Sequence, residues 1–91
     1  MVTRCVKVKL YVPQCHSLKE KRMILKSILT RTRNKFNVSI AEVDLHDVHQ
    51  SICLGIAVVS GNFNHAQSVL DEVLRFIEGS FFADLVSVEF E

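Results

Sequence analysis

The sequence has 91 residues, of which 48% are hydrophobic and 23% are charged, with three glycines and one proline. This length allows one domain with a thin core, and the composition is typical of a globular protein rather than of a disordered or low-complexity chain. No apolar run approaches the roughly 18 residues of a membrane-spanning helix, and the first residues are unlike a signal peptide. We therefore expect a single cytoplasmic domain over residues 1–91, with no membrane partner.

The formal net charge of +1 hides a strong asymmetry between the two parts of the chain. Residues 1–35 hold ten of the eleven Lys and Arg residues and one acid, for a net charge of +9. Residues 36–91 hold one Arg and nine acids, for a net charge of −8. Such asymmetry points to nucleic acid or another charged partner, although it is equally consistent with attraction between the two parts of the same molecule.

The first third of the chain predicts a strand and a helix. Apolar residues alternate with polar ones from Val2 to Val12, which is the period of a strand, and Pro13 ends it. Ser17 to Glu20 forms a capping box, and apolar residues at helical spacing follow it. We expect a helix over residues 18–33 that stops at Asn34.

The middle of the chain predicts a hairpin. Phe36, Val38 and Ile40 begin a second strand, and a slip in its apolar phase predicts a bulge near Ala41 and Glu42. A polar turn occupies residues 44–51. The third strand, over residues 52–59, is small or apolar on both faces, which is typical of a central strand.

The last third of the chain predicts a second helix over residues 63–77 and a fourth strand over residues 85–90. The resulting order is strand, helix, strand, strand, helix, strand. Right-handed crossovers then place both helices on one face of an antiparallel sheet. We expect an α+β, ferredoxin-like βαββαβ sandwich with strand order 4-1-3-2, a fold that hosts too many activities to indicate one.

Several segments resemble the YlxP-like family of small bacterial proteins, a domain of unknown function, and the likeness runs almost end to end. They are Ser17–Arg22 (SLKEKR), Leu25–Ser27 (LKS), Arg33–Val43 (RNKFNVSIAEV), Leu54–Ser60 (LGIAVVS) and Val73–Glu78 (VLRFIE). The resemblance implies a ferredoxin-like fold. It also implies a link to RNA or the ribosome, because genes of this family often lie near those for initiation factor two and ribosome-binding factor A. It supplies no catalytic residue.

The first predicted helix carries a row of cations. Lys19, Arg22, Lys26 and Arg33 fall within about 60° of one another on the helix and span about 21 Å along it. Such a row suits the phosphates of RNA, although a solvated helix face has the same composition. Lys21 projects closer to the apolar side of the helix. There its aliphatic stem would be covered, and its ammonium would only reach back to solvent.

The predicted sheet face opposite the helices allows two interpretations. Lys7, Lys9 and Tyr11 would extend the nucleic-acid surface there, and Tyr11 offers one stacking platform. The third strand contributes no aromatic residue to this face, so the RNA-recognition-motif signature is missing. Small and apolar residues on a solvent-facing sheet also suggest coverage by a second copy of the chain, and a homodimer is therefore the competing expectation.

Metal and thiol chemistry have weaker support. Asp44, His46 and His49 are candidate metal ligands, but their spacing fits no established site and a solvated turn is the commoner origin of such residues. Cys5, Cys15 and Cys53 are odd in number and widely spaced, which favours reduced, buried thiols. We expect no enzyme, no cofactor and no small-molecule substrate, with a metal- or thiol-dependent activity as the remaining alternative.

The sequence therefore predicts an RNA- or ribosome-associated binding module that uses its basic first helix. The alternative is a protein-interaction or homodimerising assembly module with no nucleic-acid role. The two differ in whether the cations of the first helix stay available to an external anion.

Overall fold

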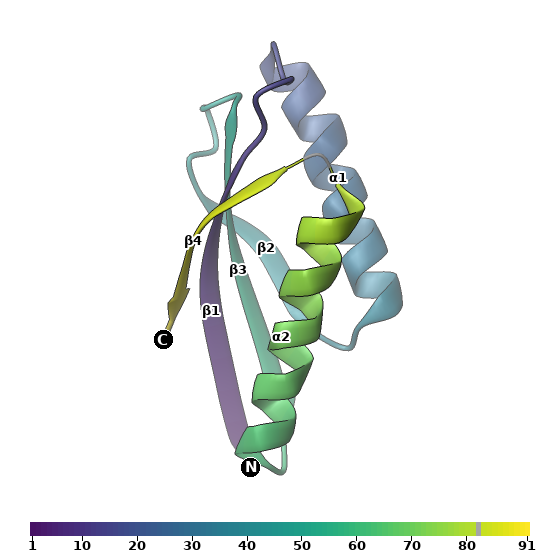
Figure 1. Ribbon diagram of the computed structural model, residues 1–91, viewed down its shortest axis with the longest axis vertical. Coiled ribbons are helices and arrows are strands. Elements are labelled where there is room, and N and C mark those ends of the chain that lie inside the picture. The colour runs from purple at the N-terminus through teal and green to yellow at the C-terminus, as the bar shows by residue number, and fades with distance from the viewer. Residues whose placement is uncertain (82) are drawn as a thin grey trace.

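The computed structural model describes residues 1–81 and 83–91. Figure 1 shows a sheet with both helices on one side of it. In chain order its elements are β1 (Val2–Tyr11), α1 (Leu18–Lys35), β2 (Ser39–Asp44), β3 (Ser51–Ser60), α2 (Phe63–Ser80) and β4 (Asp84–Phe90). The strands are antiparallel and lie in the order β2-β3-β1-β4, which confirms the predicted ferredoxin-like topology.

The core lies between the sheet and the two helices. The two central strands supply most of it, because alternate residues of β1 and β3 point towards the helices. The fully buried side chains of these two strands and α2 are Val6, Val8, Leu10, Ile52, Leu54, Ile56, Ala66, Leu70, Val73 and Ile77. Helix α1 is buried less completely, with Ile28 as its one fully buried apolar residue. Neither described helix is long and apolar enough to cross a membrane.

Helix α1 begins as predicted and ends later than predicted. The Ser17 hydroxyl accepts a hydrogen bond from the Glu20 amide at 3.1 Å. The Glu20 carboxylate accepts one from the His16 amide at 2.9 Å, one residue before the usual partner in a capping box. The predicted stop at Asn34 is wrong: the helix continues to Lys35, because the Phe36 amide still donates to Thr32 at 2.9 Å.

Strand β2 is shorter than predicted, and its bulge lies close to the predicted position. The strand begins at Ser39 rather than Phe36, and the register shifts between Glu42 and Asp44, next to the bulge predicted near Ala41 and Glu42. Glu42 pairs with Leu54, which faces the helices, whereas Asp44 pairs with Cys53 on the other side of the sheet. Regular alternation from Ile40 therefore points the Glu42 carboxylate towards α1, and the bulge after it sends the Asp44 carboxylate away, so the two do not form a carboxylate pair.

The bulged residue also explains a glycine in the central strand. A Cβ atom added to Gly55 would lie 2.8 Å from Cγ1 of Val43, which is too close for any carbon–carbon contact. Val43 is half exposed and lies over Gly55 on the sheet face that the helices leave uncovered. We call this face the open face. Glycine at position 55 is needed because the bulge folds a valine across it.

This contact makes a double-mutant prediction. Gly55→Ala should lower the free energy of unfolding by about 1 kcal/mol, because Val43 has to move. In a Val43→Ala background the same change should be neutral or stabilising by up to about 1 kcal/mol, since alanine costs less entropy than glycine in a strand. Urea unfolding of the four proteins measures both effects. Equal destabilisation in both backgrounds would show that Val43 is not the reason for the glycine.

Candidate nucleic-acid interface

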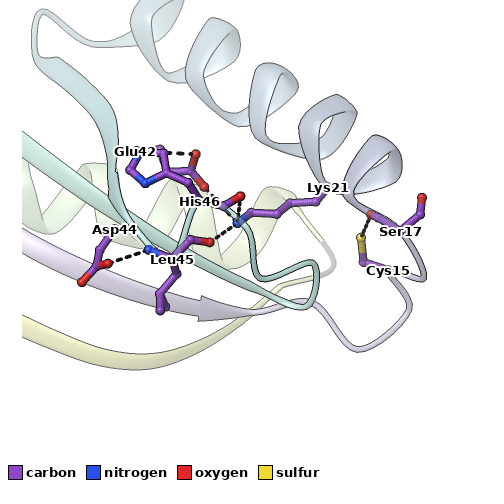
Figure 2. Close-up of polar contacts among 7 residues, drawn as sticks. All are labelled: Cys15, Ser17, Lys21, Glu42, Asp44, Leu45 and His46. Carbon is purple, nitrogen blue, oxygen red and sulfur yellow. Dashed lines mark hydrogen bonds and ion pairs between the residues drawn. The ribbon is translucent and has the colours of Figure 1, made fainter.

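Lys21 is the α1 cation whose charge is compensated inside the protein. Its side chain is only 1% exposed, and Figure 2 shows it reaching from the start of α1 to the loop between β2 and β3. The ammonium donates to the backbone carbonyl of Leu45 at 2.5 Å and to that of His46 at 3.4 Å. Its counter-ion is Glu42, with Nζ 3.0 Å from Oε2. The expectation that Lys21 would only reach back to solvent is therefore wrong.

Glu42 reaches this site because it lies in regular register with Ile40 on the helix side of β2, before the bulge. Its side chain is 14% exposed and its Oε1 lies 3.8 Å from His46 Nε2. Among the described residues, the buried Oε2 atom has no hydrogen-bond partner, so the Lys21 charge alone compensates it. Leu45 adopts a left-handed backbone conformation (φ 58°), which turns the loop beside the ammonium. One buried ion pair thus joins α1 to the β2–β3 hairpin.

Hydrogen bonds join the same loop to the segment before α1. The Val12 amide donates to the Gln50 carbonyl at 2.8 Å, and the Gln50 side chain donates to the Pro13 carbonyl at 3.1 Å. The start of α1, the β1–α1 connection and the β2–β3 loop therefore form one end of the molecule, visible at the top of Figure 1. The buried ion pair and these hydrogen bonds hold the start of α1 against the β2–β3 loop.

Three of the four predicted ridge cations point to solvent. Lys19, Arg22 and Lys26 are exposed, and no carboxylate of residues 1–81 or 83–91 forms an ion pair with any of them. The fourth, Arg33, is exposed as a residue, but it donates from one guanidinium nitrogen to the Ile40 carbonyl of β2 at 2.7 Å. We call Lys19, Arg22 and Lys26 the basic ridge. Because the fold does not neutralise it, it can meet an external anion.

The remaining cations of α1 cover aromatic rings, which the sequence did not predict. Arg31 lies 4.8 Å from the ring centroid of Phe81, and Lys35 lies 5.0 Å from that of Phe76. Phe36 packs edge-on against Phe76 at 5.6 Å. These contacts hold the end of α1 against α2 and leave the phenylalanines covered by charge. The signal in the sequence is weak, since the rings and cations come from separate segments.

The open face differs from the basic ridge in its charge. Lys7 lies 3.9 Å from Glu89 of the neighbouring strand β4, and Glu91 and Asp44 lie around the same face. Further along β1, Lys9 is exposed and Tyr11 is 40% exposed. Basic and acidic groups therefore alternate on the open face, and α1 lies on the opposite side of the sheet.

The candidate metal ligands are spread over both faces of the sheet. The Asp44 carboxylate accepts a hydrogen bond from the Leu45 amide at 2.7 Å on the open-face side, whereas His46 lies beside Glu42. His49 is exposed in the loop. No three histidine, cysteine or acidic side chains come together as a ligand set within the described chain.

The three thiols differ in their burial. Cys15 is buried and donates to the Ser17 carbonyl at 3.3 Å, and Cys5 is half-buried on β1. Burial raises the pKa of the Cys53 thiol, with the Asp44 carboxylate acting in the same direction against Lys7 and Lys9. A raised pKa disfavours the thiolate, which is the reactive form.

The architecture matches known ferredoxin-like folds. The structure superposes on a de novo designed protein with a ferredoxin fold at a TM-score of 0.67, with 18% sequence identity, over 100% of this chain and 86% of that chain. The sequence matches the family described as "Protein of unknown function (DUF503)" over residues 3–90. The chain is also 52% identical over 62 residues to "Uncharacterized protein YlxP" of Bacillus subtilis, covering 68% of this chain and 67% of that protein. The chain therefore belongs to the DUF503 family.

The buried ion pair predicts an unusual stability pattern. Lys21→Met should lower the free energy of unfolding by about 3 kcal/mol, because it leaves the Glu42 charge and two carbonyls without a partner. Combining it with Glu42→Met should recover most of that loss, because two apolar side chains then occupy the space. Lys26→Met, on the exposed side of the same helix, should change stability by no more than about 0.5 kcal/mol. Urea unfolding compares the variants, and equal effects at positions 21 and 26 would refute the assignment.

Proposed function

We propose that the protein binds the phosphate backbone of double-stranded or otherwise helical RNA through the basic ridge of α1. The observation that carries this proposal is the contrast between Lys21 and its neighbours. The fold neutralises Lys21 with Glu42 at 3.0 Å, whereas Lys19, Arg22 and Lys26 are exposed without an ion pair among the described residues. An uncompensated row of cations attracts a polyanion and releases its counter-ions on contact.

The geometry of the ridge supports contact with a backbone rather than with a single phosphate. Lys19 to Lys26 covers seven residues, or about 10 Å along the helix. Three cations on that length face successive phosphates of one groove edge. Arg33 lies a further 10 Å or so along the same side and keeps guanidinium donors beyond the bond to Ile40, so it extends the surface at reduced strength.

The distribution of aromatic side chains favours helical RNA over single strands. Recognition of single strands relies on exposed rings that stack on bases. Here Phe36, Phe76 and Phe81 pack together under Arg31 and Lys35, while Phe63 and Phe90 both lie under Arg4. Tyr11 lies on the open face, away from α1. Phe63 and Phe90 are 51% and 39% exposed, but no ring of residues 1–81 or 83–91 lies against Lys19, Arg22 or Lys26, which suits recognition by shape and phosphate position.

The separation of basic from acidic residues favours binding of a polyanion at α1. Helix α1 holds seven of the eleven Lys and Arg residues: Lys19, Lys21, Arg22, Lys26, Arg31, Arg33 and Lys35. Seven of the ten acids lie on α2, on β4 or around the open face, and the other three are Glu20 of α1, Glu42 and Asp47. A polyanion is therefore attracted to one side of the molecule and repelled from the others. We expect Lys7, Lys9 and Tyr11 to contribute little, because acids surround them.

A binding experiment with matched charge loss tests the proposal. The probe is a mixed-sequence RNA duplex of about 20 base pairs, longer than one dsRNA-binding domain covers, with its single strand for comparison. The ridge variant is Lys19→Gln/Arg22→Gln/Lys26→Gln. The control is Lys7→Gln/Lys9→Gln/Arg75→Gln, which removes three charges from the open face and α2. Filter binding at about 50 and 200 mM salt measures affinity and its salt dependence.

The wild-type protein should prefer the duplex and lose affinity steeply with salt. The ridge variant should bind at least about tenfold more weakly, with a salt slope smaller by roughly three, because three phosphate contacts are lost. The control should stay within about threefold of the wild type. Equal losses in the two variants would show that net charge alone governs binding. No duplex binding by the wild type at low salt would overturn the proposed function.

A further inference from the structure

The centre of the open face is a strip of small and apolar residues that nothing in the described chain covers. Figure 1 shows both helices on the opposite side of the sheet. The strip crosses the three strands β1, β3 and β2 and consists of Cys5, Ala41, Val43, Gly55, Ala57 and Val59. Val59 is 65% exposed and Val43 is 50% exposed. Contact of these valines with water is unfavourable. A surface that covered them would remove their apolar area from water and lower the free energy.

The surface of the strip is uneven as well as apolar. The bulge lifts Val43 over Gly55, and a hollow of about 430 Å³ lies beside it, lined by Cys5, Ala41, Gly55 and Ala57 among others. A projecting side chain next to a hollow is the arrangement that two identical surfaces need in order to interlock about a two-fold axis. The small side chains of this strip would also let two backbones approach closely.

The charges around the strip complement a second copy of themselves. The β1 cations Lys7 and Lys9 lie beside the acids Glu89 and Glu91 at the β4 side. The Lys7–Glu89 contact is long, at 3.9 Å, and the Glu89 side chain is 69% exposed, so both groups retain capacity for another partner. A two-fold axis through this face would set the cations of each copy against the acids of the other. The same acids disfavour nucleic acid on this face.

The size of the face is sufficient for a specific contact. Four strands about 4.8 Å apart and of roughly 25 Å average length present on the order of 500 Å² per copy. Pairing two such faces buries on the order of 1,000 Å² in total, at the lower end for specific protein–protein interfaces. The 10.3 kDa chain has a thin core, so this additional burial is a substantial part of the apolar area it can hide.

We infer that the open face is the contact surface of a homodimer, in which two sheets stack about 10 Å apart with the helices outermost. The two basic ridges stay on the outer layers of this dimer. The dimer therefore neither requires nor prevents RNA binding, and the two proposals fail independently.

Sedimentation velocity over protein concentrations from about 1 to 100 µM tests the inference, in the range where weak interfaces of this size associate. The test variant is Val59→Glu, which places a charge in the strip. The matched control is Met23→Glu, because Met23 is 66% exposed and Val59 65%, and Met23 lies on α1, on the other side of the molecule. Circular dichroism verifies that both variants fold, as expected for substitutions of exposed side chains.

Wild type and Met23→Glu should sediment at twice the chain mass, and Val59→Glu at the monomer mass, with at least a tenfold weaker association. A second readout is alkylation of Cys5, the half-buried thiol of this face. Its rate should fall as the wild-type concentration rises and stay constant for Val59→Glu. A wild type that remains monomeric at 100 µM overturns the inference, and so does a Val59→Glu protein that dimerises as well as the control.

Discussion

The buried ion pair between Lys21 and Glu42 is the constraint on which the polar surfaces of this protein depend. The ammonium is 3.0 Å from the carboxylate and also binds the carbonyls of Leu45 and His46. A charge this deeply buried is tolerated only with its partners in place, so it restricts the rotation of α1 and the position of the β2–β3 loop together. Together with the packing of Phe36 on Phe76 at the other end of the helix, it determines which cations of α1 face solvent.

The regular alternation of β2 up to Glu42 makes the ion pair possible, and a bulge follows it. Alternation from Ile40 sends Glu42 to the helix side of the sheet, and the bulge after it sends Asp44 to the open face and places Val43 across Gly55. The strand therefore supplies a counter-ion to α1 from its regular part, and its bulged residue makes the uncovered face uneven. The two surfaces proposed for binding, the basic ridge and the open face, lie on opposite sides of the sheet.

The fold could be predicted from the sequence because it depends on local patterns. The alternation in β1, the capping serine of α1 and the helical stripe of α2 each determine their element without reference to distant residues. The strand order then follows from the rules of chain connection. The predicted end of α1 was too early because Asn34 suggested a stop. Packing of Phe36 on Phe76 supports two more helical residues, Asn34 and Lys35.

The candidate site was less predictable, because its decisive contacts join residues far apart in the chain. Helical periodicity placed Lys19, Arg22 and Lys26 on one outward row, and the structure agrees. It could not show that Glu42 would reach Lys21, since one residue of register decides which face a strand side chain occupies. Likewise, the stacking of Arg31 on Phe81 and of Arg4 on Phe90 depends on tertiary packing alone.

Lysine footprinting by mass spectrometry tests the central claim most directly, because it compares Lys21 with its neighbours in one sample. An amine-reactive reagent is applied to the protein with and without duplex RNA, and modification is quantified at each lysine. Our account predicts that Lys21 stays unmodified in both samples, while Lys19 and Lys26 react in the free protein and become protected by RNA. Modification of Lys21 at the rate of Lys19, or bound RNA that leaves Lys19 and Lys26 unprotected, would contradict it.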